Sequence, residues 1–481
     1  MALTQQLSSL IASQKLSSGV RGLLSWRNVA SITERRPLVL VLLWVGQLVA
    51  LTGSGLTGFT LGIWTYQRTG SATKYALILL FTTLPAVVIS PFAGSLVDRY
   101  DRRRILIATH VGIGGSTLLL ALLLITGRLE VWHIYLTSAF QSALNTFQWL
   151  ALSAAVTLIV PQKHFGRASG MTQLCEAIAR IVAPALAGAL LLLMRLWGVL
   201  LINCIASLIA VATLLVARIP DLAGPPAGEH SRGAFFRDIV YGWSYVTARR
   251  GLLGLLILLA LTNFLSGVVV VLGTPFVLSF ASTATLGVIL SAAGVGMLIG
   301  SLVMSAWGGP KRRVYCVIGF EMLAGACIVL AGISSSAAVV GIATFVFSFS
   351  VAMTLAASQA IWQSKVEPGV QGRVFAVRRM IAWSMLPLAY AIAGPLADKV
   401  FGPLLVIGGP LAPTVGRVLG VGPGRGIGLL FIILGTFVVL ISASAFLSPR
   451  LRLVEEELPD ATSQFSPASL RNEAFQESGE I

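Results

Sequence analysis

Twelve apolar runs, each long enough to cross a lipid bilayer, follow one another along this 481-residue chain. A crossing takes about 20 predominantly apolar residues, and within lipid only helices and closed barrels satisfy their backbone hydrogen bonds. Charged residues make up only 11% of the chain, against about 25% in a soluble domain. The sequence therefore predicts an all-α membrane protein with helices near 38–66, 74–97, 105–126, 131–159, 168–193, 196–217, 251–279, 284–307, 314–332, 336–362, 373–397 and 426–447.

The chain also repeats itself at a spacing of 206 residues. Gly94-Ser-Leu-Val recurs at Gly300, and a segment that ends at Arg167 recurs in one that ends at Arg373. Two homologous bundles within one chain are the parallel-repeat architecture of many secondary transporters. The repeat therefore predicts two six-helix bundles that alternate access to a site between them.

Lysine and arginine are distributed unevenly between the two sets of loops. About 26 of the 34 lie on the side that holds 1–37 and 218–250, and seven lie on the other side. Basic loops stay on the cytoplasmic side of a membrane, so both termini are expected to be cytoplasmic in a multi-pass protein of the cytoplasmic (inner) membrane. This bias accounts for the net charge of +16, and no nucleic-acid partner is expected.

The intervals between the runs divide the chain into five parts. A Gly- and Pro-rich break at 221–228 precedes apolar and charged positions at helical spacing over 235–243, which predicts an interfacial helix. The leader is expected either to lie on the inner membrane surface as a short helix or to be disordered. We expect a cytoplasmic leader at 1–37, an N-terminal bundle at 38–217, a cytoplasmic linker at 218–250, a C-terminal bundle at 251–447 with a Gly- and Pro-rich outer loop at 398–425, and a polar, disordered cytoplasmic tail at 448–481.

Residue types that bind metals or perform catalysis are scattered. The four cysteines lie in predicted spans without a CxxC pair, and the four histidines show no ligand spacing. No phosphate-binding loop of the ATPase type occurs in the sequence, and no nucleophile, acid and base converge as an enzyme would need. We expect no cofactor, no metal and no enzymatic activity.

The loop after the second run carries a family signature. It reads Gly-Ser-Leu-Val-Asp-Arg-Tyr-Asp-Arg-Arg-Arg over 94–104 and resembles the loop motif of the major facilitator superfamily, Gly-x-Leu-x-Asp-Arg-x-Gly-Arg-Lys/Arg. Asp101 stands where the family prefers glycine. With the repeat and the span count, the resemblance covers nearly the whole chain. It implies the major facilitator fold, with 12 transmembrane helices in two six-helix bundles.

The resemblance also implies a role for this loop. Asp98 and Arg102 are expected to latch the cytoplasmic side when the protein opens outward. The alternative is that the arginines only set the topology. The expected latch residues are Gly94, Asp98, Arg99, Arg102 and Arg103.

Two further stretches narrow the resemblance. Gly170, Ala183, Pro184 and Gly188 in the fifth run resemble the superfamily's antiporter motif, which implies export, although such spacing also occurs in any closely packed membrane helix. The stretch 147–155 resembles the drug–proton antiporter branch that includes macrolide-efflux and enterobactin-exporter proteins. The arginine that many superfamily antiporters carry in the fourth span is missing.

Ionisable residues deep in a membrane are costly and are therefore functional candidates. Glu176 lies about 15 Å into its run, with Arg180 four residues later on the same face. We expect Glu176 to exchange a proton under the influence of Arg180, or the two to form a structural ion pair. Glu321 is a second proton-coupling candidate. Arg378 and Arg379 are expected to reach back toward the inner surface.

Uncharged polar side chains within the runs suggest a substrate cavity. A cavity with few fixed charges suits bulky amphipathic molecules, and the alternative for each residue is hydrogen bonding between helices. We expect a monomer that exports an amphipathic small molecule (drug, antibiotic, siderophore or secondary metabolite) by proton antiport, with membrane lipids around it. A lipid or lysophospholipid transporter of the same fold is the alternative. The candidate cavity residues are Gln47, Gln141, Asn145, Gln148, Asn263 and Gln359.

Overall fold

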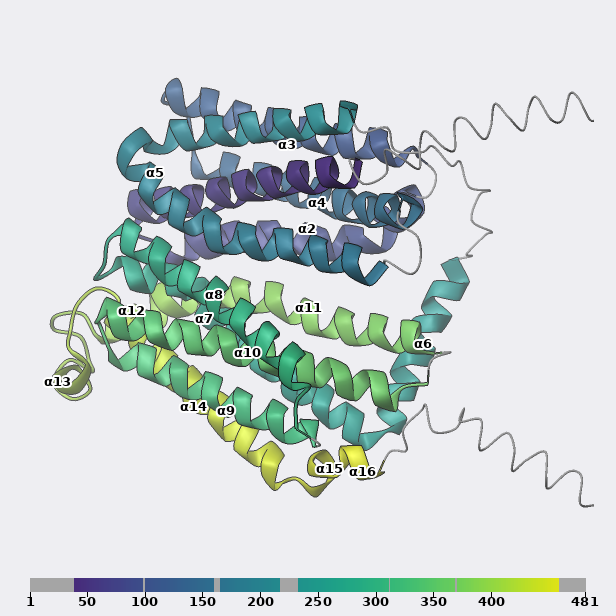
Figure 1. Cartoon of the computed structure of the whole chain (residues 1–481). Helices are drawn as coiled ribbons and strands as arrows, with labels where there is room; N and C mark the ends of the chain where they lie inside the picture. The colour runs from purple at the N-terminus through teal and green to yellow at the C-terminus, as the bar shows by residue number, and fades with distance from the viewer. Residues whose placement is uncertain are drawn as a thin grey trace, which may run out of the picture.

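The structure, a computed structural model, is a bundle of long helices that run side by side (Figure 1). It describes residues 39–97, 100–159, 165–216, 232–310, 312–367 and 370–457. The described residues between 39 and 216 form one group of helices, the N-terminal half, and those between 250 and 447 form a second group, the C-terminal half (Figure 1). The prediction of an all-helical membrane protein is confirmed over the described residues.

The N-terminal half begins with a helix over Val39–Thr69. Arg195 interrupts the last helix of this half with non-helical backbone angles (φ 57°, ψ 178°). The interruption coincides with the predicted break between the runs that end at 193 and begin at 196. The other helices are α2 (Ala72–Val97), α3 (Arg102–Ile125), α4 (Val131–Ile159) and α5 (Phe165–Val216), which includes both sides of Arg195.

The C-terminal half holds six long helices and a folded loop. The long helices are α7 (Arg250–Leu278), α8 (Thr283–Trp307), α9 (Arg313–Ile333), α10 (Ala337–Lys365), α11 (Gln371–Pro395) and α14 (Arg425–Leu447). A π-helical turn, η2 (Leu396–Phe401), continues α11 and leads into the short helices α12 (Gly402–Leu404) and α13 (Gly416–Leu419). Helix α6 (Arg232–Ala248) precedes this half, and α15 (Pro449–Arg452) and α16 (Val454–Glu457) follow it.

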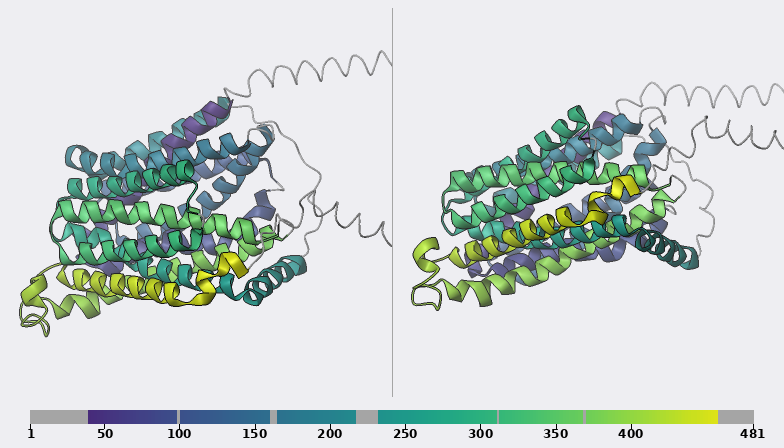
Figure 2. Two further views of the ribbon diagram at one scale, coloured as in Figure 1. Left: turned by 60° about the horizontal axis from the view of Figure 1, so that its bottom comes forward. Right: turned by 90° about the horizontal axis from the view of Figure 1, so that it is seen from below.

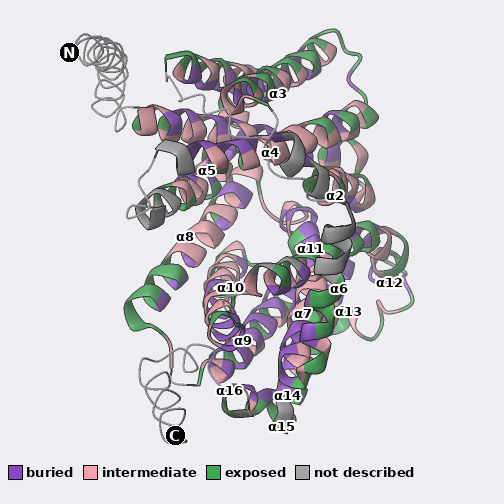
Figure 3. Cartoon of the chain, turned by 90° about the vertical axis from the view of Figure 1, so that its right-hand side faces the viewer, coloured by how far each residue is buried: buried purple, intermediate pink, exposed green. Residues whose placement is uncertain are grey.

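Ten of the described helices are long and apolar enough to cross a membrane, judged by length and composition. Many of their apolar side chains face outward: Leu193 is 79% exposed, Leu208 68% and Val288 64%. A soluble protein rarely exposes large contiguous apolar surfaces. Lipid is therefore the natural surrounding of the bundle. Seen from one end, buried residues gather inside the helix groups and exposed residues lie around the outside (Figure 3).

The bundle has two distinguishable ends. The turn end carries the connections at 70–71, 126–130, 195 and 279–282 together with the folded loop at 402–424, and the linker end carries α6, α15 and α16. Both views of Figure 2 show the folded loop and α6 at opposite ends of the bundle. The two halves meet mainly where α5 packs on α8 and where α2 packs on α11.

The prediction of a disordered tail from residue 448 is wrong for 449–457, which form α15 and α16. Leu451 packs against Gly254 of α7: a Cβ atom added to Gly254 would lie 3.1 Å from the Cγ atom of Leu451. Val454 is fully buried. Glu455 accepts a hydrogen bond of 3.0 Å from the backbone N–H of Val314 in the first turn of α9. Apolar burial and helix capping thus fix this segment to the C-terminal half.

Candidate functional site

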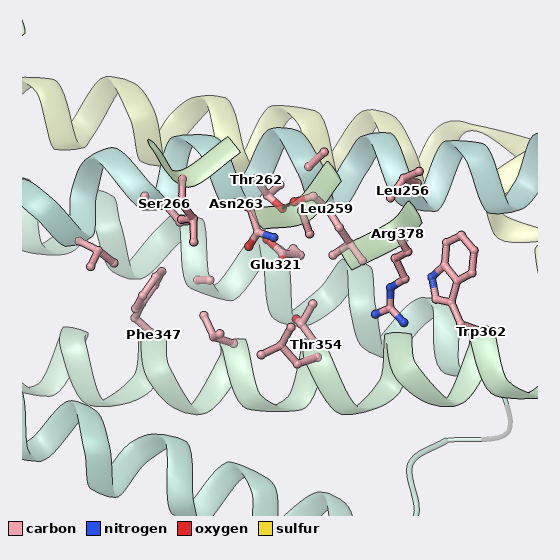
Figure 4. Close-up of a pocket in the computed structure, with 18 of the residues that line it drawn as sticks. Leu256, Leu259, Thr262, Asn263, Ser266, Glu321, Phe347, Thr354, Trp362 and Arg378 are labelled. Carbon is pink, nitrogen blue, oxygen red and sulfur yellow. Dashed lines mark hydrogen bonds between the residues drawn. The ribbon is translucent and has the colours of Figure 1, made fainter. Parts of the chain in front are cut away.

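A cavity of about 200 Å³ opens between α7, α9, α10 and α11 within the C-terminal half. Its walls are mainly apolar, and its polar groups converge from different helices: Thr262 and Asn263 from α7, Glu321 from α9, and Arg378 from α11. Figure 4 shows Glu321 beside Thr262 and Asn263, with Arg378 and Trp362 further along the same cavity. An apolar pocket with a few convergent polar groups is the usual form of a small-molecule site.

Glu321 is the carboxyl group of this cavity. It lies eight residues after the start of α9, which corresponds to a depth of about 12 Å. Its side chain is 9% exposed and lies beside Thr262 and Asn263 in the cavity (Figure 4). A carboxyl group so far from bulk water is stabilised by hydrogen bonds or by protonation. The position therefore suits a group that gains and loses a proton.

Arg378 lines the same cavity and differs from its predicted position. Its guanidinium donates hydrogen bonds to Gln359 Oε1 (2.8 Å) and Ser358 Oγ (3.1 Å). It also lies 5.2 Å from the ring centroid of the fully buried Trp362. The expectation that Arg378 reaches back to the inner surface is wrong, because α10 supplies two acceptors and an aromatic face that hold it inward.

The second membrane carboxyl, Glu176, lies in a separate cavity of about 440 Å³ in the N-terminal half. This cavity is lined by Leu51 and Gly55 of the first helix and by α5 from Glu176 to Pro184. Arg180 lines it too and is exposed. No ion pair joins Glu176 to Arg180 in the described structure, whose ion pairs involve other residues. The two groups share a cavity without neutralising each other.

The uncharged polar candidates divide between two settings. In the N-terminal half, Gln148 donates to Gln47 Oε1 (3.1 Å), and Gln141 donates to the hydroxyls of Ser116 and Thr117. These bonds connect helices of one half. Asn145 is exposed on α4. Of the six candidates, Asn263 alone lines the cavity of Glu321. Gln359 accepts a hydrogen bond from Arg378, which also lines that cavity.

The loop motif is described only in part. Asp98 and Arg99 lie outside the described residues, and Gly94 and Arg102 lie at the end of α2 and the start of α3. Arg103 donates from Nε to the carbonyl of Leu214 (3.0 Å) and from Nη2 to that of Leu215 (2.7 Å), at the end of α5.

The departure from the family motif at Asp101 has a structural reason. Its carboxylate accepts a hydrogen bond of 2.8 Å from the backbone N–H of Arg103 and thereby caps the N-terminus of α3. Aspartate is among the preferred residues at this position of a helix. Glycine would leave this donor of the first turn without a side-chain acceptor.

The small residues of the antiporter-like motif lie where helices approach closely. A Cβ atom on Gly188 would lie 3.2 Å from Ala284 Cα, and one on Gly287 would lie 2.6 Å from the Pro184 carbonyl oxygen, so α5 and α8 meet nearly backbone to backbone. The Ala183 methyl would lie 2.8 Å from a Cβ atom on Gly55 of the first helix. Gly170 lies in α5 near the linker end.

Comparison with known proteins defines the family. The sequence profile of the Major Facilitator Superfamily matches residues 43–391, and the chain belongs to this family. It is 25% identical over 370 residues to Macrolide efflux protein A of Streptococcus pyogenes, and the matched region covers 74% of this chain and 89% of that protein. It is 25% identical over 378 residues to multidrug efflux pump Tap of Mycolicibacterium fortuitum, and the matched region covers 76% of this chain and 90% of that protein.

A solved structure shows the same fold. The bacterial homologue of the human lysosomal transporter Spinster, in an inward-facing and unoccupied conformation, superposes with a TM-score of 0.65 over 87% of this chain and 98% of that chain, at 14% identity. The chain is therefore a multi-pass transporter of the cell membrane and not an enzyme. Among the described residues no cluster of potential metal ligands occurs.

Proposed function

We propose that this protein exports an amphipathic small molecule across the cytoplasmic membrane by proton antiport. The names of its efflux relatives support export. The observation that carries the proposal is a buried carboxyl group, Glu321, in an apolar cavity that has few other charges. In such a cavity an amphipathic molecule and a proton can exclude each other, and alternate occupancy by the two couples an antiporter.

We propose twelve spans in two halves of six. Ten helices meet the length and hydropathy of a span. Dividing α5 at Arg195 adds one span, because its two parts run in opposite directions. Helix α4, with 29 residues, adds the twelfth; its polar Gln141, Asn145 and Gln148 lower its hydropathy. The basic linker end is then cytoplasmic, together with both termini.

In this arrangement the protein is in an inward-facing state. At the turn end, α5 and α8 touch from Ile181 to Gly188, and Ser291 of α8 donates to the Ile181 carbonyl (2.7 Å). Glu176 and Arg180 precede Ile181 along α5 and therefore lie on the linker-end side of these contacts. In the C-terminal half, Arg378 lies between the linker end and Glu321, so a molecule from the cytoplasm passes Arg378 first (Figure 4).

The test is proton movement in everted vesicles that are acidified by respiration. Macrolides, cationic dyes and catecholate siderophores are added in turn to wild type, Glu321→Gln and Glu176→Gln. We expect one compound class to release the gradient with wild type. Glu321→Gln should abolish this release, because a glutamine side chain cannot take up and give back a proton as the substrate moves.

The matched control is Glu130→Gln, which removes an exposed carboxyl at the turn end and should leave the release unchanged. Full proton release by Glu321→Gln would refute coupling through this residue. Loss in Glu176→Gln alone would assign coupling to the N-terminal half instead.

A further inference from the structure

One carboxylate of the C-terminal half reaches across to the N-terminal half. Asp398, in the π-helical turn η2, accepts hydrogen bonds from the Ser71 hydroxyl (2.7 Å) and from the backbone N–H groups of Ala72 (3.0 Å) and Thr73 (2.9 Å). These donors belong to the residue before α2 and to its first turn. Asp398 is therefore the N-terminal cap of a helix in the other half.

The chemistry of a helix start explains why this contact is favourable. The first N–H groups of a helix have no partner within the helix, and the helix dipole places a partial positive charge there. A carboxylate satisfies both requirements, and hydrogen bonds to an ionised acceptor are about twice as strong as neutral ones. If the halves separate at the turn end, two backbone donors and the carboxylate lose their partners together.

The backbone around Asp398 is built for this approach. Gly394 of α11 lies against the backbone of Thr73, so closely that a Cβ atom would overlap Thr73 Cα. After Pro395 the chain widens into the π-helical turn, which carries Asp398 onto the start of α2. A small residue and an altered helix period thus bring the carboxylate and its donors together.

In the part of the chain that the structure describes, the other polar contacts between the halves at the turn end join uncharged groups. Tyr75 of α2 donates to Thr274 of α7 (3.0 Å), and Gln67 of the first helix donates to Thr283 of α8 (3.4 Å). Further inside the bundle, Arg379, eight residues into α11, lies 5.3 Å from the ring centroid of Trp149 of α4. Among the described residues, Asp398 thus contributes the acidic side chain to the turn-end contacts between the halves.

We propose that Asp398 is a positioning residue of the transport cycle: its bonds to the start of α2 hold the turn end closed, and they must break before the protein opens outward. The inference rests on the proposed alternation between inward-facing and outward-facing states. It goes beyond that proposal because it assigns the closed state to one carboxylate and its three donors.

The test measures distances between spin labels in the purified full-length protein in lipid nanodiscs. One pair, at Arg128 and Ser336, spans the halves at the turn end, and a second pair, at Tyr100 and Gln363, spans them at the linker end; all four side chains are exposed. The four native cysteines are replaced first. No substrate and no proton gradient are needed, so failure of this proposal is distinguishable from failure of the proposed function.

Asp398→Asn should raise the population with a long turn-end distance about tenfold, equivalent to about 1.4 kcal/mol, and should shorten the linker-end distance. Asp398→Glu, which keeps the charge, should shift the distances less. Ser71→Ala, which removes one donor, should shift them in the same direction by a smaller factor, and it decides the question if Asp398→Asn does not fold. Wild-type distances in a folded Asp398→Asn protein, or in Ser71→Ala where the first does not fold, would overturn the proposal.

Discussion

Two carboxylates in this molecule cap helices that are distant in sequence. Asp398 caps α2 across the boundary between the halves, and Glu455 caps α9 within the C-terminal half through the N–H of Val314. The hydrogen-bond chemistry is the same, with donor–acceptor distances near 3.0 Å. The difference lies in what the two bonded segments do next, because only the first pair must separate in a transporter that alternates access.

The surroundings of the two caps match this difference. Glu455 sits in a packed segment: its carbonyl accepts a hydrogen bond from Lys365 Nζ (2.6 Å), the next residue pairs with Arg312, and Val454 is fully buried. Asp398 is half-buried and has uncharged polar contacts nearby. A cap that is reinforced on several sides stabilises a fold, whereas a cap that stands between two moving bodies controls an equilibrium between states.

The largest effect is expected from Gly394→Val. A side chain at this position overlaps the Thr73 backbone, and helices that meet backbone to backbone cannot absorb it. The halves should be forced apart at the turn end, so that transport falls at least about 100-fold, as when a two-state protein is trapped in one state. Vesicle transport and the turn-end spin-label distance measure this together.

Gly319→Val provides the matched control, because a Cβ atom on Gly319 meets no atom within 4 Å. The same valine in a membrane helix should leave both transport and distances unchanged. If Gly394→Val left transport and distances unchanged, the α2–α11 contact would not limit the movement of the halves, and the distinction between the two caps would be wrong.

A smaller and different effect is expected from Glu455→Gln. Loss of a capping carboxylate destabilises a protein by about 1 kcal/mol, so the thermal midpoint in detergent should fall while the spin-label distances stay as in wild type. A shift of the turn-end distance in this variant would show that both caps act on the same equilibrium. The contrast between them would then be lost.

A smaller shift of the conformational equilibrium than in Asp398→Asn is expected from Tyr75→Phe. It removes one neutral hydrogen bond between the halves, to Thr274, which is worth about 1 kcal/mol. The outward-open population should rise about fivefold, in the same direction as in Asp398→Asn. An opposite shift would mean that the Tyr75 hydroxyl is better satisfied in the open state.

The sequence predicted the broad features because they depend on local composition. Apolar runs located the helices, the gap between 193 and 196 located the interruption at Arg195, and membrane depth drew attention to Glu176 and Glu321. Arg378 was placed wrongly, since snorkelling toward water is the default for an arginine whose acceptors, Gln359 and Ser358, lie on another helix.

Asp398 gave no signal at all in the sequence. It stands at the start of a Gly- and Pro-rich stretch, and its partner Thr73 lies 325 residues away in the chain. Nothing in a local pattern reveals that two helix ends from different halves meet. The same holds for Glu455, because its role as the cap of α9 depends on the contact between α16 and α9 in the folded structure.

The most direct test of the contrast is hydrogen–deuterium exchange of wild type and Asp398→Asn, read from peptides over 70–78, 284–291 and 313–320. If Asp398 holds the halves together, the variant should exchange faster at the start of α2 and in the part of α8 that packs on α5. The start of α9 should stay as protected as in wild type. Faster exchange confined to 70–78 would show that Asp398 is only a local cap and would contradict the account.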